Sequence, residues 1–142
     1  MLMGTYSHSL DAKGRLIIPA KLREELGASF IITKSPDSCL SVYSKEEWEN
    51  FIGALSKLPK ISSEPARRVR RFYFGNSTEL EPDKQGRIVI PQELRTFANL
   101  TKDIALVGVD DHLEIWDMDT WNKYNEAEDL SDIVYDLDGI NL

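Results

Sequence analysis

A nine-residue segment occurs twice in this chain of 142 residues. Residues 11–19 read Asp-Ala-Lys-Gly-Arg-Leu-Ile-Ile-Pro, and residues 83–91 read Asp-Lys-Gln-Gly-Arg-Ile-Val-Ile-Pro. The similarity continues beyond the motif, because residues 11–27 and 83–99 align without a gap and are identical at seven of seventeen positions. A repeat at a fixed spacing indicates a repeated structural unit. We therefore expect two half-chains, each of which carries one copy of the same supersecondary unit.

The two halves are expected to share one hydrophobic core. A unit of about 50 residues is marginally stable by itself, whereas the whole chain suits one compact domain. No apolar run approaches the roughly 20 residues of a membrane span, and residues 1–8 lack the basic and long apolar regions of a secretory signal. The single cysteine, Cys39, excludes an internal disulfide and suits a reducing cytosol.

The acidic side chains are concentrated at one end of the chain. The net charge is −7, which by itself argues against a nucleic-acid ligand. Residues 125–142 contain six acidic side chains and no Lys or Arg, so residues 1–124 carry a net charge of only −1. Binding to a phosphate backbone requires a local basic surface rather than a basic protein. Nucleic acid is therefore not excluded, although tight binding by one isolated subunit is not expected.

Each half is predicted to contain two strands, a short helix, two further strands and then a longer helix. Residues 11–14 and 82–86 have the composition of turns, and the β-branched residues that follow favour strands. The proline after each of these strands suits the first position of a helix, and Gly27 and Asn99 are expected to end the two short helices. Strands are expected at 4–10, 15–18, 30–33, 40–43, 77–81, 87–90, 104–108 and 113–116, and short helices at 21–26 and 91–98.

The longer helices carry signals at their ends. Ser44 and Glu47 form a Ser-x-x-Glu capping box, and the apolar residues that follow keep helical spacing until Pro59, which is expected to end the helix. A connecting helix is expected to start near residues 62–65 and to close at Gly75-Asn76, and the last helix to run from about Asp117 through Tyr124.

The two repeated segments, with the order of strands around them, give the chain a resemblance to the MraZ family. The resemblance covers essentially the whole chain and includes the opening Met-Gly-Thr-Tyr-Ser-His-Ser-Leu-Asp-Ala-Lys-Gly-Arg and the later Glu-Leu-Glu-Pro-Asp-Lys-Gln-Gly-Arg. The family consists of bacterial transcriptional regulators built from two SpoVT/AbrB-type repeats. The resemblance implies an α+β fold in which two tandem swapped-hairpin, AbrB-like β-β-α-β-β repeats form a pseudo-twofold β-barrel, each followed by a helix.

The resemblance also implies how the chain is divided and what it does. It implies a sequence-specific DNA-binding regulator, commonly a repressor, that binds short tandem repeats as an oligomeric ring. The implied targets are the division and cell-wall gene cluster and the protein's own promoter, and the implied location is the cytoplasm, in association with the nucleoid. The expected parts are repeat 1 at 4–46, a helical connector at 47–75, repeat 2 at 76–119, and a C-terminal helix with an acidic tail at 120–142.

The resemblance assigns the DNA contacts to the aspartate and the arginine of each motif. An arginine beside a glycine turn projects with little steric cover, and its planar fork suits a guanine edge or a phosphate. The aspartate would orient the arginine or accept a hydrogen bond from a cytosine amine. Each turn also carries an exposed lysine that suits phosphate contact. The candidate DNA-binding residues are Asp11, Lys13, Arg15, Asp83, Lys84 and Arg87.

Two alternatives concern the same turns. Each arginine could form an exposed ion pair with its aspartate, worth about 0–1 kcal/mol, and bind nothing. In the second turn, Glu81-Pro82 precedes Asp83, and a longer hairpin there would displace Arg87 relative to Arg15.

Other basic and aromatic residues are assigned mainly structural roles. Arg23 and Arg95 are equally consistent with solvated surface, an interface or a DNA contact. The arginine cluster at 67–71 either faces DNA or meets an acidic partner subunit or the acidic tail, and the structural role is favoured. The aromatic residues of the longer helices, which include Trp48, Phe51, Phe72, Phe74, Trp121 and Tyr124, are expected to pack rather than to stack on bases.

Other function classes lack their sequence signals. His8 and His112 have no neighbours at metal-ligand spacing, and Cys39 has the context of a small buried residue. The chain contains no P-loop, dinucleotide fingerprint or nucleophile elbow, so we expect no enzyme, cofactor, membrane contact or small-molecule substrate. The alternative to a DNA-binding regulator is an antitoxin-like or scaffold module that holds a protein partner.

Overall fold

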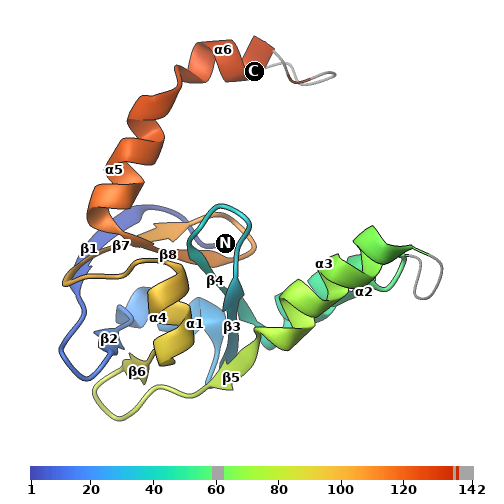
Figure 1. The fold of residues 1–142 in the computed structure, drawn as a ribbon. Coiled ribbons are helices and arrows are strands. Elements are labelled where there is room, and N and C mark those ends of the chain that lie inside the picture. The colour runs from blue at the N-terminus through green and yellow to red at the C-terminus, as the bar shows by residue number, and fades with distance from the viewer. Residues whose placement is uncertain (59–62, 136, 138–142) are drawn as a thin grey trace.

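The computed structural model describes residues 1–58, 63–135 and 137, and it has the expected α+β fold (Figure 1). Each half contributes two strands, a short helix, two strands and a longer helix, in the predicted order. The strands are β1 (Thr5–Ser9), β2 (Arg15–Ile17), β3 (Phe30–Lys34), β4 (Leu40–Ser44), β5 (Thr78–Leu80), β6 (Arg87–Val89), β7 (Asp103–Gly108) and β8 (Leu113–Asp117). The helices are α1 (Ala20–Leu26), α2 (Lys45–Leu55), α3 (Glu64–Gly75), α4 (Gln92–Phe97), α5 (Met118–Ala127) and α6 (Leu130–Tyr135).

The strands of the two halves interdigitate. A six-stranded antiparallel sheet has the order β1-β7-β8-β4-β3-β5, and β2 pairs with β6 in a separate two-stranded sheet. The contacts β1–β7, β4–β8, β3–β5 and β2–β6 each join one half of the chain to the other. The strands that the resemblance assigns to a barrel are thus divided between two sheets. The edge strands of the larger sheet, β1 and β5, each pair with a strand from the other half of the chain.

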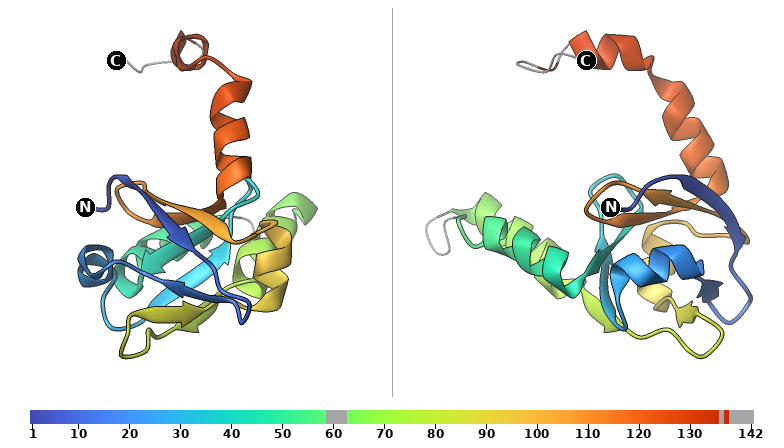
Figure 2. Two further views of the ribbon diagram at one scale, coloured as in Figure 1. Left: turned by 90° about the vertical axis from the view of Figure 1, so that its left-hand side faces the viewer. Right: turned by 180° about the vertical axis from the view of Figure 1, so that it is seen from behind.

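The core lies between the six-stranded sheet and a layer formed by β2, β6, α1 and α4 (Figures 1 and 2). Equivalent positions of the two repeats enter this core, since Ile18 and Ile90 are both fully buried and Leu22 and Leu94 nearly so. A smaller cluster around the buried Trp116 packs under the start of α5. The sharing of one core by both halves agrees with the expectation that neither half is stable alone.

The predicted helix starts are close to those observed. The Ser44 hydroxyl accepts the backbone N–H of Glu47 at 3.1 Å, and Ser63 caps α3 through the N–H of Ala66. The prediction that proline takes the first helical position is off by one residue, because Pro19 and Pro91 are the residues just before α1 and α4. Both prolines have extended ψ angles, 142° and 144°, so they end the preceding segment rather than begin the helix.

The ends of the helices differ more from expectation. Gly27 and Asn99 follow the short helices with positive φ angles, as expected. Helix α2 ends at Leu55, before the predicted stop at Pro59, which lies outside the described residues. Helix α6 follows α5 in the segment that was expected to be an acidic tail. Within the described part of the chain, no helix is long and apolar enough to cross a membrane.

Aromatic side chains attach the α2–α3 hairpin to the sheet. The ring of Tyr43 on β4 stacks on Phe51 of α2 with a centroid distance of 5.2 Å, and Phe51 meets Tyr73 of α3 edge-on at 4.9 Å. Phe72 in turn contacts Phe97 of α4 at 6.2 Å. The expectation that these helix aromatics pack, rather than form an open stacking platform, is confirmed for this cluster.

Candidate nucleic-acid interface

The first repeated motif folds into a turn that its own aspartate holds together. One carboxylate oxygen of Asp11, Oδ1, accepts the backbone N–H groups of Lys13 and Arg15, both at 2.9 Å. Gly14 occupies the position that requires a positive φ, 79°, and its N–H bonds the carbonyl of Asp11 at 3.0 Å. The turn therefore has a defined shape before any ligand is present.

The second motif folds in the same way. Asp83 Oδ1 accepts the backbone N–H groups of Gln85 and Arg87 at 2.9 Å, and Gly86 has the same φ of 79°. The sequence left open that Glu81-Pro82 lengthens this hairpin and displaces Arg87, but the turn has the same hydrogen bonds and the same glycine φ as the first. The reason is local, because the hydrogen bonds that shape the turn lie within residues 83–87 and do not involve the residues before them.

Each aspartate also holds its arginine by one edge. The Nε of Arg15 donates to Asp11 Oδ2 at 2.6 Å, and the Nε of Arg87 donates to Asp83 Oδ2 at 2.8 Å. Among the described residues, no hydrogen bond engages the two terminal nitrogens of Arg15. These terminal nitrogens form the fork that can bond a guanine edge or a phosphate in two places. The ion pair therefore orients the arginine and leaves its terminal nitrogens available.

The hydrogen bonds of the turns also lower the pKa of both aspartates. For Asp11 the largest cause is the backbone N–H of Arg15, which outweighs the partial desolvation that acts in the opposite direction. The same causes, in the same order, lower the pKa of Asp83 through Arg87. Both carboxylates stay charged at neutral pH, so each arginine keeps its anionic partner.

The two turns lie at the two ends of one short antiparallel ladder, because each precedes one of the paired strands. In the β2–β6 ladder, Arg15 lies opposite Val89, and Arg87 lies opposite Ile17. Each turn is also tied to the other strand, since the N–H of Ile90 donates to the carbonyl of Gly14 at 2.9 Å. The equivalent bond, from Ile18 to Gly86, is 3.0 Å long. The fold thus joins two motifs that are 72 residues apart in the sequence into one pseudo-symmetric surface.

Arg23 and Arg95 support these turns, a role that differs from the solvated surface, interface or DNA contact that the sequence left open. The Nε of Arg23 donates to the carbonyl of Ile18 at 2.8 Å, and its guanidinium lies against Gly86 of the opposite repeat. A Cβ atom at Gly86 would lie only 2.7 Å from the Arg23 Cζ atom. Arg95 has the same relation to Gly14, with its Nε 2.9 Å from the carbonyl of Ile90. The signal in the sequence was the identity of these two arginines across the repeat.

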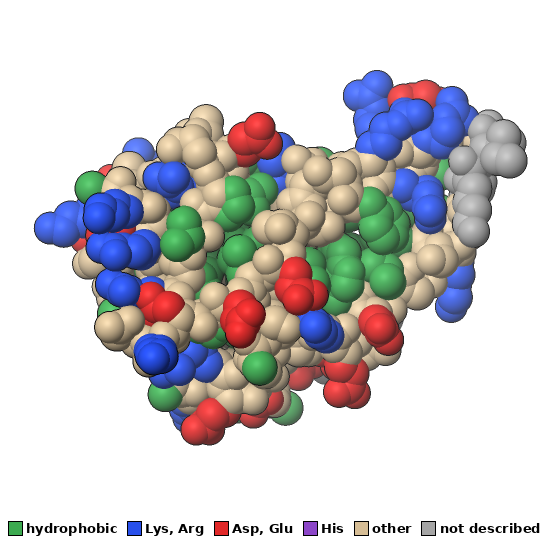
Figure 3. Space-filling view, turned by 90° about the horizontal axis from the view of Figure 1, so that it is seen from below, with side chains coloured by type: hydrophobic (Ala, Val, Ile, Leu, Met, Phe, Trp, Pro, Cys, Tyr) green, Lys and Arg blue, Asp and Glu red, His purple; other side chains and the backbone are tan. Residues whose placement is uncertain are grey.

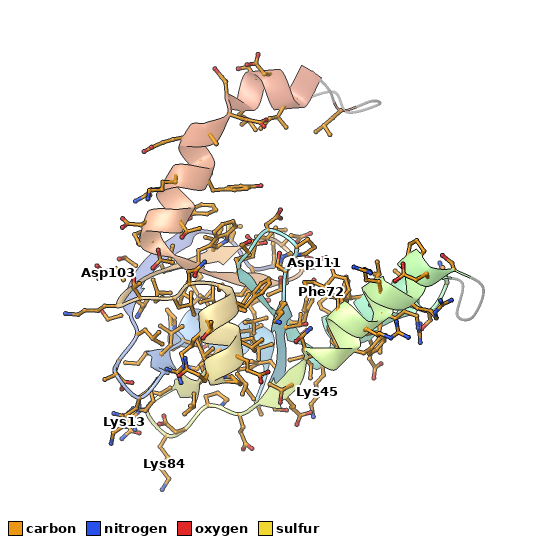
Figure 4. The ribbon with its side chains drawn as sticks, in the orientation of Figure 1. Lys13, Lys45, Phe72, Lys84, Asp103 and Asp111 are labelled. Carbon is orange, nitrogen blue, oxygen red and sulfur yellow. The ribbon has the colours of Figure 1, made fainter. Side chains whose placement is uncertain are left out.

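The two lysines extend the same surface but break its symmetry. Lys13 and Lys84 project at the same end of the molecule (Figure 4). The space-filling view from this end shows a group of Lys and Arg side chains there, and a second group over the α2–α3 hairpin (Figure 3). In the repeat alignment Lys84 corresponds to Ala12, and Lys13 corresponds to Gln85. The Gln85 side chain accepts from Arg87 at 3.2 Å, so the second arginine is held at two points.

The remaining candidates of the sequence lie away from the turns. Cys39 is fully buried, and burial raises the pKa of its thiol to about 12. His112 stacks on Tyr43 at 5.1 Å and bonds Asp111 and Glu114. Among the residues that the structure describes, no group of three or more His, Cys, Asp or Glu side chains is placed to hold a metal ion.

Comparison with known proteins agrees with this architecture. The model of the family described as "MraZ protein, putative antitoxin-like" matches residues 1–72 and again residues 73–135. The chain is 48% identical to the transcriptional regulator MraZ of Thermoanaerobacter sp. (strain X514), with both chains covered in full. This chain belongs to the MraZ family.

Other MraZ proteins have similar identity over nearly the same length. The transcriptional regulator MraZ of Caldanaerobacter subterraneus subsp. tengcongensis is 46% identical with both chains fully covered. That of Acetivibrio thermocellus is 49% identical over 92% of this chain and 91% of its own. These MraZ proteins are named transcriptional regulators, which are not a class of enzyme. The family model matches this chain twice, once over each half of the fold.

Proposed function

We propose that this chain is a DNA-binding transcriptional regulator that reads DNA with the paired turns of β2 and β6. The observation that carries the proposal is the pair of arginines that equivalent aspartates orient in the same way. An Nε-anchored guanidinium loses less freedom on binding than a free one, and its terminal fork suits a guanine edge. The contacts with bases belong in this proposal to Arg15 and Arg87, and those with phosphate to Lys13 and Lys84, while Asp11 and Asp83 hold the arginines.

The proposal extends to assembly and target. A subunit with a net charge of −7 and few exposed cations at its turns binds DNA weakly, so several subunits must bind together. A ring of subunits on short tandem repeats meets this requirement. We propose that the protein acts mainly as a repressor of the division and cell-wall cluster and of its own promoter, in the cytoplasm at the nucleoid. Repeat 1 (4–46) and repeat 2 (76–119) each carry one turn. The helical connector (47–75) joins them, and the C-terminal helix with the acidic tail (120–142) follows repeat 2.

Fluorescence anisotropy with duplexes from upstream of the protein's own gene tests the proposal. The Arg15→Ala/Arg87→Ala variant is compared with wild type over a salt series at matched oligomeric state. The matched control, Lys45→Ala/Lys123→Ala, removes the same charge from two exposed residues on other elements. We expect the Arg15→Ala/Arg87→Ala variant to lose sequence preference, whereas its salt slope stays close to that of wild type because the phosphate contacts of Lys13 and Lys84 remain.

The control variant is expected to bind like wild type. If the Arg15→Ala/Arg87→Ala variant keeps its DNA affinity and its sequence preference while it remains assembled, the turns do not read the DNA sequence. If assembled wild-type protein binds no duplex, DNA is not its partner, and a stoichiometric protein partner recovered by co-purification would support the antitoxin-like or scaffold alternative.

A further inference from the structure

Helix α3 presents a basic and partly apolar face that the other described residues leave exposed. Arg68, Arg71 and Phe74 follow one another at intervals of three residues, so they lie on one side of the helix; both arginines are exposed, and Phe74 is 41% exposed. The guanidinium of Arg70 lies over the Phe74 ring at 5.4 Å and so adds positive charge beside this apolar side chain. We call Arg68, Arg71 and Phe74 the basic face. An exposed apolar group rimmed by one sign of charge suits a partner with acidic and apolar side chains.

The C-terminal segment of the same chain has the opposite character. We call residues 124–135 the acidic arm, which comprises the end of α5 and all of α6. Leu130 is 71% exposed and Ile133 is 37% exposed, three residues apart on one side of α6. The acidic side chains of the arm lie around these two residues and are all exposed; they are Glu126, Glu128, Asp129 and Asp132.

Helix α6 has little support within its own subunit. It contains six residues, and a helix of this length is not stable in water by its own hydrogen bonds. Figures 1 and 2 show α5 and α6 standing away from both sheets, so the core does not supply the missing burial. A second molecule that covers Leu130 and Ile133 would supply it.

The basic face and the acidic arm do not meet within one subunit. The α2–α3 hairpin and the arm leave the sheets in different directions (Figures 1 and 2). The two surfaces are complementary in charge, and the exposed Phe74 of one can meet the exposed Leu130 and Ile133 of the other. Because they are different surfaces, a contact between them in two copies is heterologous, which leads to a closed ring or an open chain.

We propose that the acidic arm of one copy docks on the basic face of α3 in a second copy, head to tail. Leu130 and Ile133 pack against Phe74, and the surrounding carboxylates face Arg68 and Arg71. The proposal rests on the proposed function only in the expectation that subunits assemble, and it assigns α3 to a protein contact instead of DNA.

Charge reversal on each surface of the full chain provides the test. The basic-face variant is Arg68→Glu/Arg71→Glu. The arm variant is Glu128→Lys/Asp132→Lys, which leaves Asp129 to bond the N–H of Ser131 at the start of α6. Matched controls reverse the same number of exposed charges on other elements, Lys21→Glu/Lys102→Glu and Glu24→Lys/Glu93→Lys. Circular dichroism and thermal unfolding confirm that each variant folds, and light scattering after gel filtration measures its mass without DNA.

We expect wild type and both controls to have a mass several times that of the 16.2 kDa chain. Each surface variant alone is expected to fall to the mass of one chain. An equimolar mixture of the two surface variants is expected to recover the assembly, because each reversed surface then meets its reversed partner. Recovery by mixing is specific to a heterologous contact and would not follow from general damage.

Three results would overturn the proposal. The first is a folded basic-face variant that stays fully assembled, and the second is a mixture that does not recover. The third is wild type with the mass of a single chain, which would also remove the ring from the proposed function. If the basic-face variant assembles but loses DNA binding, α3 contacts DNA instead of a second copy. The role of the turns is then decided separately, by the Arg15→Ala/Arg87→Ala variant.

Discussion

Arg23 and Arg95 show how a single side chain can connect two repeats. Each bonds a carbonyl of its own repeat and lies against the glycine of the opposite turn. The glycine is therefore needed for its positive φ, and a Cβ atom there would also require the guanidinium to shift. The shape of each proposed DNA contact depends on a residue from the other half of the chain.

The positive φ predicts that Gly14→Ala destabilises the protein. Alanine in this left-handed conformation costs about 1–2 kcal/mol, and its Cβ atom, 2.7 Å from the Cζ atom of Arg95, also requires that side chain to shift. We expect a loss of stability of about this size in urea unfolding. Gly53→Ala is the control, because Gly53 lies inside α2 with no other atom within 4 Å of its Cβ position, and alanine there should stabilise by about 0.5–1 kcal/mol. Equal effects at the two positions would contradict the need for glycine in the turn.

His112 is predicted to make stability depend on pH. Burial lowers its pKa, but hydrogen bonds to Glu114 and Asp111 and their charges raise it, and the pKa is raised overall. A raised folded-state pKa stabilises the protein fully below the unfolded value of about 6.5 and loses this effect as pH rises through the folded pKa. The stability difference between wild type and His112→Gln should therefore be largest near pH 5.5 and shrink towards pH 8.

Chemical unfolding at several pH values measures this difference. His8→Gln, which removes a histidine outside this network, corrects for the loss of one imidazole. A difference that grows as pH rises would show that the charged form of His112 does not stabilise the fold.

At the scale of elements, β2 and β6 are short strands whose pairing places the turns. Each contains three residues, and the central residue of each, Leu16 or Ile88, is buried while the last, Ile17 or Val89, is exposed. Such short strands have few hydrogen bonds, so their position depends on the buried central pair. The alternation of the strand thus points the central residue, which anchors the pair of strands, into the core. The arginine that follows each turn points to the other side.

We predict that Ile88→Ala destabilises the protein by about 2–5 kcal/mol, since a fully buried side chain leaves a cavity. The neighbouring Val89→Ala, at a side chain that is 57% exposed, should cost less than about 1 kcal/mol. Denaturant unfolding of the two variants gives the comparison. Similar losses at both positions would mean that the β2–β6 pair is not anchored in the core.

At the scale of the molecule, neither half contains the strand that pairs with its own edge strand. Four of the six strand pairings join residues before 76 to residues after it, and both halves supply side chains to one core. The long-range pairing brings together two turns that are far apart in sequence. The proposed reading surface therefore exists only in the complete fold.

Separate fragments should reveal this dependence. We expect fragments 1–75 and 76–142 to be largely unfolded by circular dichroism when each is alone, because each lacks its cross-repeat partners. An equimolar mixture should regain strand signal and a cooperative thermal transition. A fragment that folds cooperatively by itself would show that the repeats are independent units.

The sequence alone determined the repeat, the order of elements, the turn chemistry and the family resemblance, because these depend on residues close together in the chain. Asp11 and Gly14 lie three residues apart, and so do Asp83 and Gly86, and this spacing sufficed to predict both turns. The local signals were weaker where a helix ends without a proline or glycine, as at Leu55, or where it forms in an acidic segment, as in α6.

Only the tertiary structure decided which residues of the two halves meet. The pairing of β2 with β6 and the placement of Arg23 against Gly86 depend on contacts across the chain, which periodicity and local propensity do not encode. The same holds for the separation of the basic face from the acidic arm, since exposure follows from how all the elements pack. Local spacing shapes each turn, whereas burial in the shared core sets where the two turns stand relative to each other.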